Sequence, residues 1–469
     1  MIFISKKVKE NRLLLYELNE VPIKVLKLYV EKNPLSSFAY LLNNGLLINT
    51  YTFDEEELHP WSTWPTVHRG VTNKVHNIKF INQDLNCAKE YKPIWEILSL
   101  NSISVGVFGS LQSYPPIVNS NISFFLPDTF SPDENSYPDK LSKFQKFNLE
   151  IVGKNKAIAR KISLKQVFDY LGLALNDSIS ISSIKSSFFH ILKEFINKKY
   201  ASRRSILQGV FTFDLYLKYL NKYQPRFSTY FTNHVAGMMH RYWRNLFPED
   251  FNLNSEDVDK FHKESIFKAM DIADIHMRQL LLLSKKKNYD LLIVSSMGQK
   301  SMDWGNYIPE LALIEFKKFL DCLELKSSDY ELLPAMQPDI CIKAINENSL
   351  NFLRSVIKDF VDKNGNPVLI ERYEPEGMRL NLSIQKLQEI SKSKIFIYKE
   401  NIFNVEDAGF QIISRDIGTG YHTPEGILIA YGKIKDNFKK FEDKTLDTRS
   451  ISPMILDYFG VEKPSYMRY

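Results

Sequence analysis

Residues 13–20 read Leu13-Leu14-Leu15-Tyr16-Glu17-Leu18-Asn19-Glu20, and this stretch decides the fold. Its first six residues form a short, almost continuous apolar run, which is typical of a parallel strand buried on both faces of a sheet. The polar pair Asn19 and Glu20 follows at the carboxyl end, where open α/β sheets bind their ligands. The stretch therefore predicts a buried strand that opens into a site.

The segments that follow alternate between helical and strand patterns. Apolar residues recur at helical spacing over 23–42 and 94–100, while apolar runs at 46–51 and 103–109 predict strands. Later runs at 227–232, 291–295 and 426–432 return to the strand pattern, and a long amphipathic stretch covers 261–284. Strands that alternate with helices predict an α/β protein with a mostly parallel sheet and helices on both faces.

A chain of 469 residues is long enough for one large domain and a smaller one. We assign the main α/β core to residues 1–126, 226–306 and 385–469. Residues 127–225 are rich in Asn, Ser and Lys at helical spacing and predict a helical insertion. Residues 307–384 predict a small α+β subdomain, with strands at 339–344 and 367–372 on either side of a helix at 349–361.

The composition excludes several classes of protein. Hydrophobic residues make up 44% and charged residues 25%, which is ordinary for a globular chain. The net charge of +6 is mild and its lysines are scattered, so we expect no nucleic-acid partner. Three cysteines without a CxxC spacing argue against a disulfide framework. No apolar run approaches the roughly 18 residues of a membrane span or forms a signal peptide, so we expect a cytoplasmic protein.

The segment 59–70 combines hydroxyls with basic side chains near the start of a predicted helix. Ser62, Thr63 and Thr66 are followed by His68 and Arg69. A hydroxyl at a helix N-terminus meets free backbone N–H groups and the positive end of the helix dipole, an arrangement that binds phosphate or stabilises an alkoxide. Helix capping by Ser and Thr is the structural alternative.

Three histidines follow predicted strands or lie beside a glycine turn. These are His234, His240 and His422. Because the ends of parallel strands meet at one edge of a sheet, we expect the three imidazoles to be candidate metal ligands. A satisfied structural role is the alternative for each of them taken alone.

Several fragments, taken in chain order, resemble one family. They are Leu13–Asn19 with the helix after it, Thr63 to Ile78 with Thr72-Asn73 and His76-Asn77-Ile78, Met239-His240-Arg241-Tyr242-Trp243, Val294-Ser295-Ser296-Met297-Gly298, Gly420-Tyr421-His422-Thr423-Pro424-Glu425-Gly426-Ile427, and the closing segment 451–460. The set resembles the alkaline phosphatase superfamily, nearest to its type I phosphodiesterase and nucleotide pyrophosphatase branch. The resemblance implies an alkaline phosphatase-like sheet and a two-metal phosphate site.

The resemblance also implies which residues hold metal. Glu17 stands at the first ligand position, where the family has Asp, and His240 and His422 match two further ligands. Ala236 stands where the family has Asp, and Ser296 and Met297 stand where it has Asp and His, so several ligands are missing. His234 is the candidate for the open third place. We expect at most one divalent ion, Zn²⁺ or Mn²⁺/Mg²⁺, and the alternative is no metal.

The same resemblance implies roles in catalysis. Thr63 matches the nucleophile, with Ser62 and Thr66 as alternatives and His68 as a base or a phosphate contact. We expect Arg69, Asn19 and Asn233 to bind substrate. The expected function is hydrolysis of a phosphoester or phosphodiester, or a related phosphoryl or sulfuryl transfer, on a small-molecule or glycan substrate of surface-polysaccharide metabolism. The alternative is a catalytically degenerate member that binds a glycan or acts as a scaffold.

Overall fold

The structure of the chain, a computed structural model, describes residues 10–81, 83–154, 180–303, 310–333, 335, 339–372, 377–384, 394–413 and 419–467. Within them, eight strands form the main sheet in the order β19-β2-β18-β6-β1-β5-β3-β4. β18 pairs antiparallel with β2 and β6, and all the other pairings are parallel. The strands are β1 (Leu13–Leu18), β2 (Leu46–Tyr51), β3 (Val105–Phe108), β4 (Ile122–Leu126), β5 (Phe227–Thr232), β6 (Asp290–Val294), β18 (Glu425–Tyr431) and β19 (Leu446–Asp447). The predicted α/β class with a mostly parallel sheet is confirmed.

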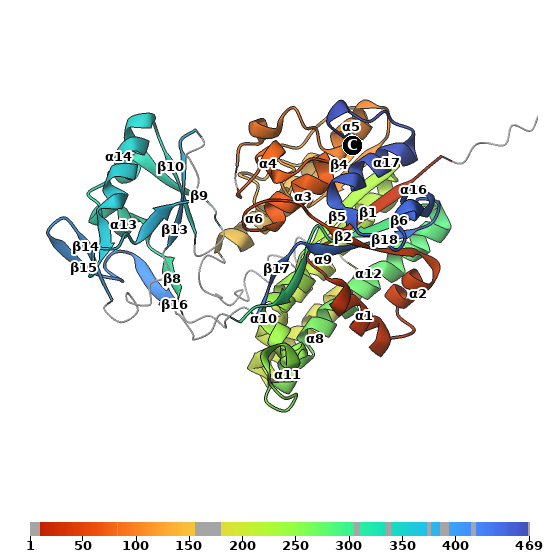
Figure 1. Cartoon of the computed structure of the whole chain (residues 1–469), viewed down its shortest axis with the longest axis horizontal. Coiled ribbons are helices and arrows are strands. Elements are labelled where there is room, and N and C mark those ends of the chain that lie inside the picture. The colour runs from red at the N-terminus through yellow and green to blue at the C-terminus, as the bar shows by residue number, and fades with distance from the viewer. Residues whose placement is uncertain are drawn as a thin grey trace, which may run out of the picture.

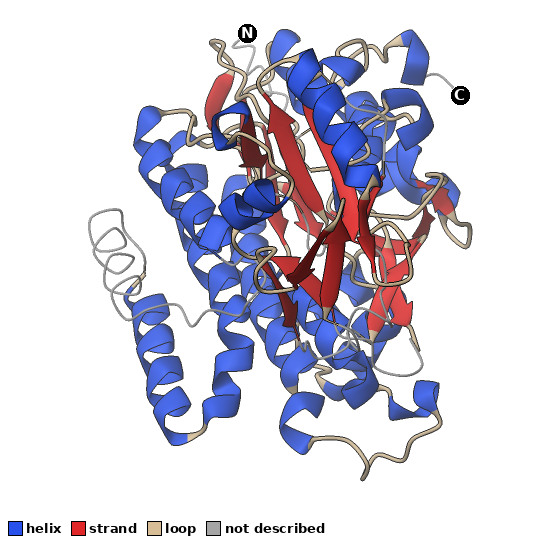
Figure 2. Ribbon diagram, turned by 90° about the vertical axis from the view of Figure 1, so that its left-hand side faces the viewer, coloured by secondary structure: helices blue, strands red, loops and turns tan. Residues whose placement is uncertain are grey.

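Helices cover both faces of this sheet, because apolar side chains point from β1 to both of them. Alternate side chains of a strand point to opposite faces. Leu14, Tyr16 and Leu18 enter one hydrophobic core, and Leu13 and Leu15 enter another. The first core is filled from α1 (Ile23–Lys32), α2 (Ser37–Asn44), α9 (Arg204–Tyr223), α10 (His234–Leu246) and α12 (Ser265–Lys287). The second is filled from α3 (Pro60–Arg69), α5 (Ile94–Leu100), α16 (Lys435–Phe438) and α17 (Ile451–Phe459), and Figures 1 and 2 show helices on both sides of the strands.

The helix predicted over 23–42 is two helices, which corrects the sequence-based expectation. α1 ends at Lys32 and α2 begins at Ser37. Pro34 disfavours helical backbone at the residue before it, so the first helix stops there. Ser36 then caps the second helix, because its hydroxyl accepts a hydrogen bond from the Ala39 N–H at 3.1 Å.

A third hydrophobic core belongs to a smaller α+β unit, drawn on the left of Figure 1. Its members come from residues 311–410, on both sides of position 384. Its elements are β8 (Glu310–Leu313), α13 (Phe316–Cys322), β9 (Tyr330–Leu333), β10 (Ile340–Ala344), α14 (Glu347–Lys358), β11 (Phe360–Asp362), β12 (Leu369–Glu371), β13 (Arg379–Ile384), β14 (Ile395–Tyr398), β15 (Asn401–Asn404) and β16 (Phe410–Ile413). The domain bounds stay a prediction.

The remaining described elements are helices and one small sheet. Between β4 and β5 lie α6 (Ser142–Lys154), α8 (Ile181–Ile196) and α9, and shorter helices are α4 (Asn73–His76) and α11 (Lys260–Lys263). β7 (Gly298–Ser301) and β17 (Gly420–Thr423) pair antiparallel as a two-stranded sheet. Among the helices that the structure describes, none has the length and apolar content needed to cross a membrane.

Candidate metal centre

One carboxylate and two imidazoles converge next to the end of β1. Glu20, His240 and His422 each offer a ligand atom, and these atoms lie within 4.8 Å of one another. Glu20 lies in the turn after β1, His240 in α10 and His422 in β17. Glu20 has a φ of 60°, a left-handed conformation that is uncommon for a residue with a side chain. The turn therefore holds the Glu20 backbone in an unusual conformation at this point.

The Glu20 carboxylate is buried and is contacted from four sides. Its Oε2 lies 2.9 Å from His240 Nε2, 3.5 Å from His422 Nε2 and 2.5 Å from the Gln299 side-chain nitrogen, which donates to it. Its Oε1 accepts a hydrogen bond of 2.7 Å from the side-chain amide of Asn19. With 2% of Glu20 exposed, these neighbours replace water around the charge.

The hydrogen bond at Nδ1 of His240 determines whether its Nε2 carries a proton or a lone pair. Nδ1 lies 2.8 Å from the carbonyl oxygen of Gly420, which can only accept, so Nδ1 carries a proton. A neutral His240 then turns the lone pair of Nε2 toward the Glu20 carboxylate. Two acceptors facing each other at 2.9 Å require a proton or a cation between them.

The pKa values of this pair shift in the directions that the contact demands. Burial raises the pKa of Glu20, but His422 and His240 outweigh it and hold that pKa well below its ordinary value. Burial lowers the pKa of His240, and the charge and hydrogen bond of Glu20 outweigh it, so the net shift is upward. The pair therefore favours a carboxylate opposite a positive group, and a proton and a metal ion compete for the same place.

The chemistry of these side chains fits a divalent transition ion. Two imidazoles and one carboxylate form a set found in catalytic zinc sites and in open iron sites. The Nδ1 contact with Gly420 is the outer hydrogen bond that usually orients a metal-binding histidine. One third of the His240 side chain is exposed, so the group has an open side for a substrate. The residues present therefore fit one ion.

Glycine is required at position 420 for this arrangement. A Cβ there would lie 2.6 Å from the Gln299 side-chain oxygen and 2.6 Å from the Met239 carbonyl oxygen. The absent side chain lets β17 approach α10 closely enough for the His240 hydrogen bond. His422 of β17 pairs with Gln299 of β7, and this pairing places both side chains against Glu20.

The structure does not bring Glu17 into this group. Glu17 is a β1 residue, and its Oε1 is hydrogen bonded to His68 Nε2 at 2.9 Å and to the Ser110 hydroxyl at 3.1 Å. Of the side chains, 0% of Glu17 and 1% of His68 is exposed. The two residues predicted as a ligand and a base thus form a closed histidine–carboxylate pair.

The three hydroxyls of α3 are buried and already hydrogen bonded. Thr63 Oγ1 lies 2.8 Å from Ser296 Oγ, and Ser62 donates to the carbonyl oxygen of His59. Thr66 donates to Asp54 at 2.8 Å. The Thr63 hydroxyl thus contacts Ser296 and not Glu20.

His76 is not placed to activate Thr66. The Ile78 N–H donates to His76 Nδ1 at 3.0 Å, so the proton of the neutral ring is on Nε2. Nε2 lies 3.1 Å from Thr66 Oγ1 and therefore donates to it. Burial lowers the pKa of His76 to about 3, which keeps the ring neutral. Hydrogen bonds run from the imidazole to the hydroxyl to Asp54, opposite to the direction that a general base needs.

Two further predicted site residues, Arg69 and His234, make hydrogen bonds within the fold and do not join the Glu20 group. Arg69 donates to the carbonyl oxygens of Ala88 and Tyr91 and is buried. His234 is satisfied on both nitrogens, by the Thr232 hydroxyl at 2.6 Å and the Ala269 carbonyl at 3.1 Å, so it does not fill the third ligand place.

Asn19 and Asn233 lie next to the group. Asn19 donates to Glu20 and, at 2.7 Å, to the Asn233 side-chain oxygen, and it accepts from the Trp64 indole at 2.8 Å. Trp64 therefore links α3 to the metal group. Asn233 is exposed, so the Asn19–Asn233 contact reaches the surface.

Sequence reasoning missed Glu20 and Gln299. The signal for Glu20 was present, because it is the carboxylate that follows the β1 strand directly, where a site was expected. Gln299 follows the glycine of the fragment Ser296-Met297-Gly298, and its side-chain oxygen is buried without a hydrogen-bond partner. No pattern in the sequence pairs Gln299 with Glu20.

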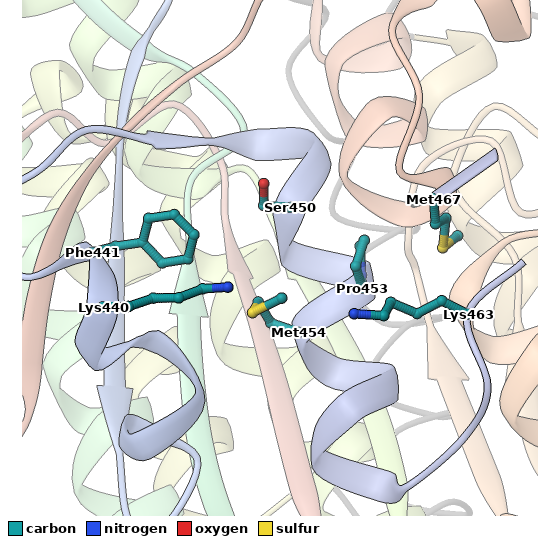
Figure 3. Close-up of a pocket in the computed structure, with 7 residues that line it drawn as sticks. All are labelled: Lys440, Phe441, Ser450, Pro453, Met454, Lys463 and Met467. Carbon is teal, nitrogen blue, oxygen red and sulfur yellow. The ribbon is translucent and has the colours of Figure 1, made fainter. Parts of the chain in front are cut away.

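A separate cavity of about 420 Å³ lies beside α17 and is drawn in Figure 3. Lys440 and Lys463 approach it from opposite sides, with Met454 between them. Lys463 is already paired with Asp457 at 2.9 Å. None of the residues that line this cavity belongs to the Glu20 group, so the cavity is not the metal centre.

Comparisons with known proteins give structures but no sequence relatives. No protein-family model matches the chain, and no curated protein matches it. Among solved structures, murine ectonucleotide pyrophosphatase/phosphodiesterase 5 is 12% identical with a TM-score of 0.41, covering 97% of this chain and 96% of that chain. The alkaline phosphatase of the Antarctic bacterium TAB5 is 10% identical with a TM-score of 0.39, covering 97% and 100%. Phosphonoacetate hydrolase of Sinorhizobium meliloti 1021 is 10% identical with a TM-score of 0.41, covering 96% of each. The chain thus matches alkaline phosphatase superfamily structures over nearly its full length, at low identity.

Proposed function

We propose that the chain hydrolyses phosphoester or phosphodiester bonds, or carries out a related phosphoryl or sulfuryl transfer, with a single divalent ion. The observation that carries the proposal is the Glu20 carboxylate facing two histidine nitrogens, one of them fixed by a carbonyl on its far side. The order of the sequence fragments that resemble the alkaline phosphatase superfamily supports the reaction class. A glycan phosphoester is the substrate class that the resemblance favours.

Glu20, His240 and His422 hold the ion in this proposal. A bound divalent ion supplies Lewis acidity toward an ester oxygen. The amides of Asn19 and Gln299 orient the Glu20 carboxylate through one hydrogen bond to each oxygen. The exposed side of His240 admits the substrate.

The nucleophile is the second part of the proposal. Thr63 matches the family nucleophile, and its hydroxyl is held by Ser296 in a buried position. A water molecule is the competing nucleophile, because it can enter from the exposed side of His240. Thr63→Val separates the two, since it removes the hydroxyl and keeps the shape of the side chain.

The experiment measures hydrolysis of p-nitrophenyl phosphate, bis-p-nitrophenyl phosphate and p-nitrophenyl sulfate with Zn²⁺, Mn²⁺ or Mg²⁺, together with metal content. We expect activity that requires metal and that falls about 100-fold or more in Glu20→Gln, since loss of a ligand costs at least as much as loss of a group that orients one. Exposed Glu55, paired with Lys74, gives the matched control Glu55→Gln. A chain that binds no stoichiometric metal, or a Glu20→Gln variant as active as the wild type, refutes the proposal.

A second candidate function is binding without turnover. The specific observation that favours it is that the hydroxyls of Ser62, Thr63 and Thr66 are all buried and hydrogen bonded. In this case the chain binds metal and a glycan phosphate but cleaves none of the esters. Metal-dependent binding of the uncleaved ester, measured by calorimetry without product formation, distinguishes it from the first proposal.

A further inference from the structure

His59 lies beside the metal group although it is not part of it. It immediately precedes α3, and its ring stacks on Trp61 with 4.3 Å between ring centres. The ring also meets the ring of His422 edge to face, with 5.6 Å between centres. Only 7% of His59 is exposed, so its nitrogens depend on protein or ligand partners.

Arg372 determines which nitrogen of His59 carries the proton. The Arg372 guanidinium lies 3.0 Å from His59 Nε2, and a guanidinium can only donate. His59 Nε2 therefore accepts, and the proton of the neutral ring is on Nδ1. The Glu57 carboxylate is 3.6 Å from the same nitrogen, too far for a good hydrogen bond, and it accepts from Arg372 at 2.6 Å instead.

Arg372 is itself held in place by the smaller unit. It directly follows β12, and its other terminal nitrogen donates to Asp339, whose second oxygen accepts from Ser383 at 2.7 Å. Three acceptors therefore fix the orientation of the guanidinium. The proton position on His59 is thus set by Arg372, a residue of the smaller unit.

Among the described residues, the buried Nδ1–H group of His59 has no hydrogen-bond partner. The same is true of the buried Nδ1 of His422 and the buried side-chain oxygen of Gln299. A buried N–H without an acceptor is rare and points to a ligand or water that completes it. Three such atoms occur on residues in or next to the Glu20 group, so a ligand or water is expected beside this group.

The chemistry of His59 selects the kind of ligand atom. Its Nδ1 carries a proton and its Nε2 is occupied by Arg372, so neither nitrogen offers a lone pair to a metal ion. An N–H donor next to a bound cation suits an anionic oxygen, which both groups attract. A phosphoryl or sulfuryl oxygen has this character.

We propose that His59 binds substrate directly, donating from Nδ1 to an anionic oxygen of the molecule held at the Glu20 metal group, and that Arg372 is its positioning residue. The inference rests on the proposed function, because the oxygen it contacts belongs to the ligand of that metal. It adds a contact from the start of α3 and assigns the smaller unit a part in the site.

The experiment uses the full chain and measures two affinities by calorimetry, first for Zn²⁺ and then for inorganic phosphate on the zinc-loaded protein. His59→Phe keeps a ring against Trp61 and removes the N–H, whereas His59→Asn keeps an amide N–H close to the position of Nδ1. We expect zinc affinity to stay within about twofold of wild type in both. Phosphate affinity should fall about 10-fold or more in His59→Phe, as for a lost hydrogen bond to a charged group, and less in His59→Asn.

Two controls share the local structure but not the position. His262 stacks on Tyr242 at 4.3 Å as His59 does on Trp61, so His262→Phe tests loss of a stacked imidazole. Arg354 forms a two-pronged ion pair with Glu371 in the same smaller unit, so Arg354→Met is matched to Arg372→Met. We expect weaker phosphate binding in Arg372→Met and wild-type binding in both controls.

The outcomes separate the two proposals. Zinc binding with equal phosphate affinity in the wild type and in His59→Phe refutes the role of His59 and leaves the metal centre standing. That result would mean that a buried water satisfies Nδ1. Absence of zinc binding in the wild type refutes the proposed function and this inference together. A loss in His59→Phe that His59→Asn partly restores supports the donor role over a role in packing.

Discussion

Replacing Glu20 by Gln tests the metal centre most directly. The substitution keeps the size of the side chain and removes the charge that faces His240 and His422. A ligand that binds the folded state alone stabilises it by about 2.7 kcal/mol when its concentration is 100 times its dissociation constant. Saturating Zn²⁺ should therefore raise the free energy of unfolding of the wild type by this amount and that of Glu20→Gln by almost nothing.

The expected shift in melting temperature follows from the size of the chain. An unfolding entropy of about 2.1 cal/mol/K per residue gives about 1 kcal/mol/K for 469 residues unfolding as one unit. Zinc at that concentration should thus raise the midpoint of the wild type by about 3 °C. Differential scanning fluorimetry with and without Zn²⁺, after treatment with a chelator, resolves a change of this size.

The measured quantity is the zinc-dependent difference within each variant. Glu20→Gln also removes the counter-charge of His240, so its midpoint without metal should fall as well. Glu55→Gln is the control, because its carboxylate is exposed and pairs only across the surface with Lys74. A Glu20→Gln variant that keeps the 3 °C increment would show that zinc binds elsewhere and would refute the assignment of the centre.

Three further variants test the centre and the hydrogen bonds of Thr66. Gly420→Ala places a methyl group 2.6 Å from the Gln299 side-chain oxygen, so calorimetry should find weaker zinc binding and scanning fluorimetry a lower midpoint; unchanged values would contradict the close approach. Thr66→Val removes a buried hydroxyl between His76 and Asp54 and should cost about 1–3 kcal/mol in urea unfolding with zinc affinity unchanged. Burial raises the pKa of Asp54 from its ordinary 3.8 to about 6, so the folded state holds its proton more tightly than the unfolded chain. Wild-type stability relative to Asp54→Asn should therefore decrease as the pH rises from about 4 to about 6, and a difference that is flat with pH would contradict the shift.

The strands of the main sheet could be predicted because their signal is local. The apolar run at 13–18 coincides with β1, and residues 227–232, which contain Phe227, Tyr230 and Phe231, coincide with β5. The helix boundary at Pro34 was missed because helical spacing continues on both sides of it. The second helix begins at the Ser36 cap, and the spacing of apolar residues does not reveal a helix cap.

The site could be predicted only in part because its contacts are not local. His240 lies in α10, the helix that follows the strand predicted at 227–232, and His422 lies close to Gly420; the structure brings the two together. Two carboxylates, Glu17 and Glu20, are three positions apart, and the resemblance to the alkaline phosphatase superfamily favours the first. The turn at Glu20 determines which carboxylate reaches the histidines. Its left-handed backbone could not be predicted, because glutamate does not favour that conformation.

The two carboxylates differ in one property that assigns their roles. Each faces a histidine nitrogen at 2.9 Å, Glu17 with His68 and Glu20 with His240. The side chains of the first pair are 0% and 1% exposed, so the pair is shielded from solvent. In the second pair one third of the His240 side chain is exposed, and a second histidine, His422, lies 3.5 Å from the same carboxylate oxygen.

The absence of a carboxylate at position 236 therefore does not remove the group of possible metal ligands. Gln299 donates to the Ala236 carbonyl oxygen at 3.3 Å as well as to Glu20, so the backbone at that position still forms part of the wall of the group. The carboxylate reaches the two histidines from the turn after β1 instead of from α10. The proposed function requires one cation position with an open side, and Glu20 with the two histidines offers that arrangement.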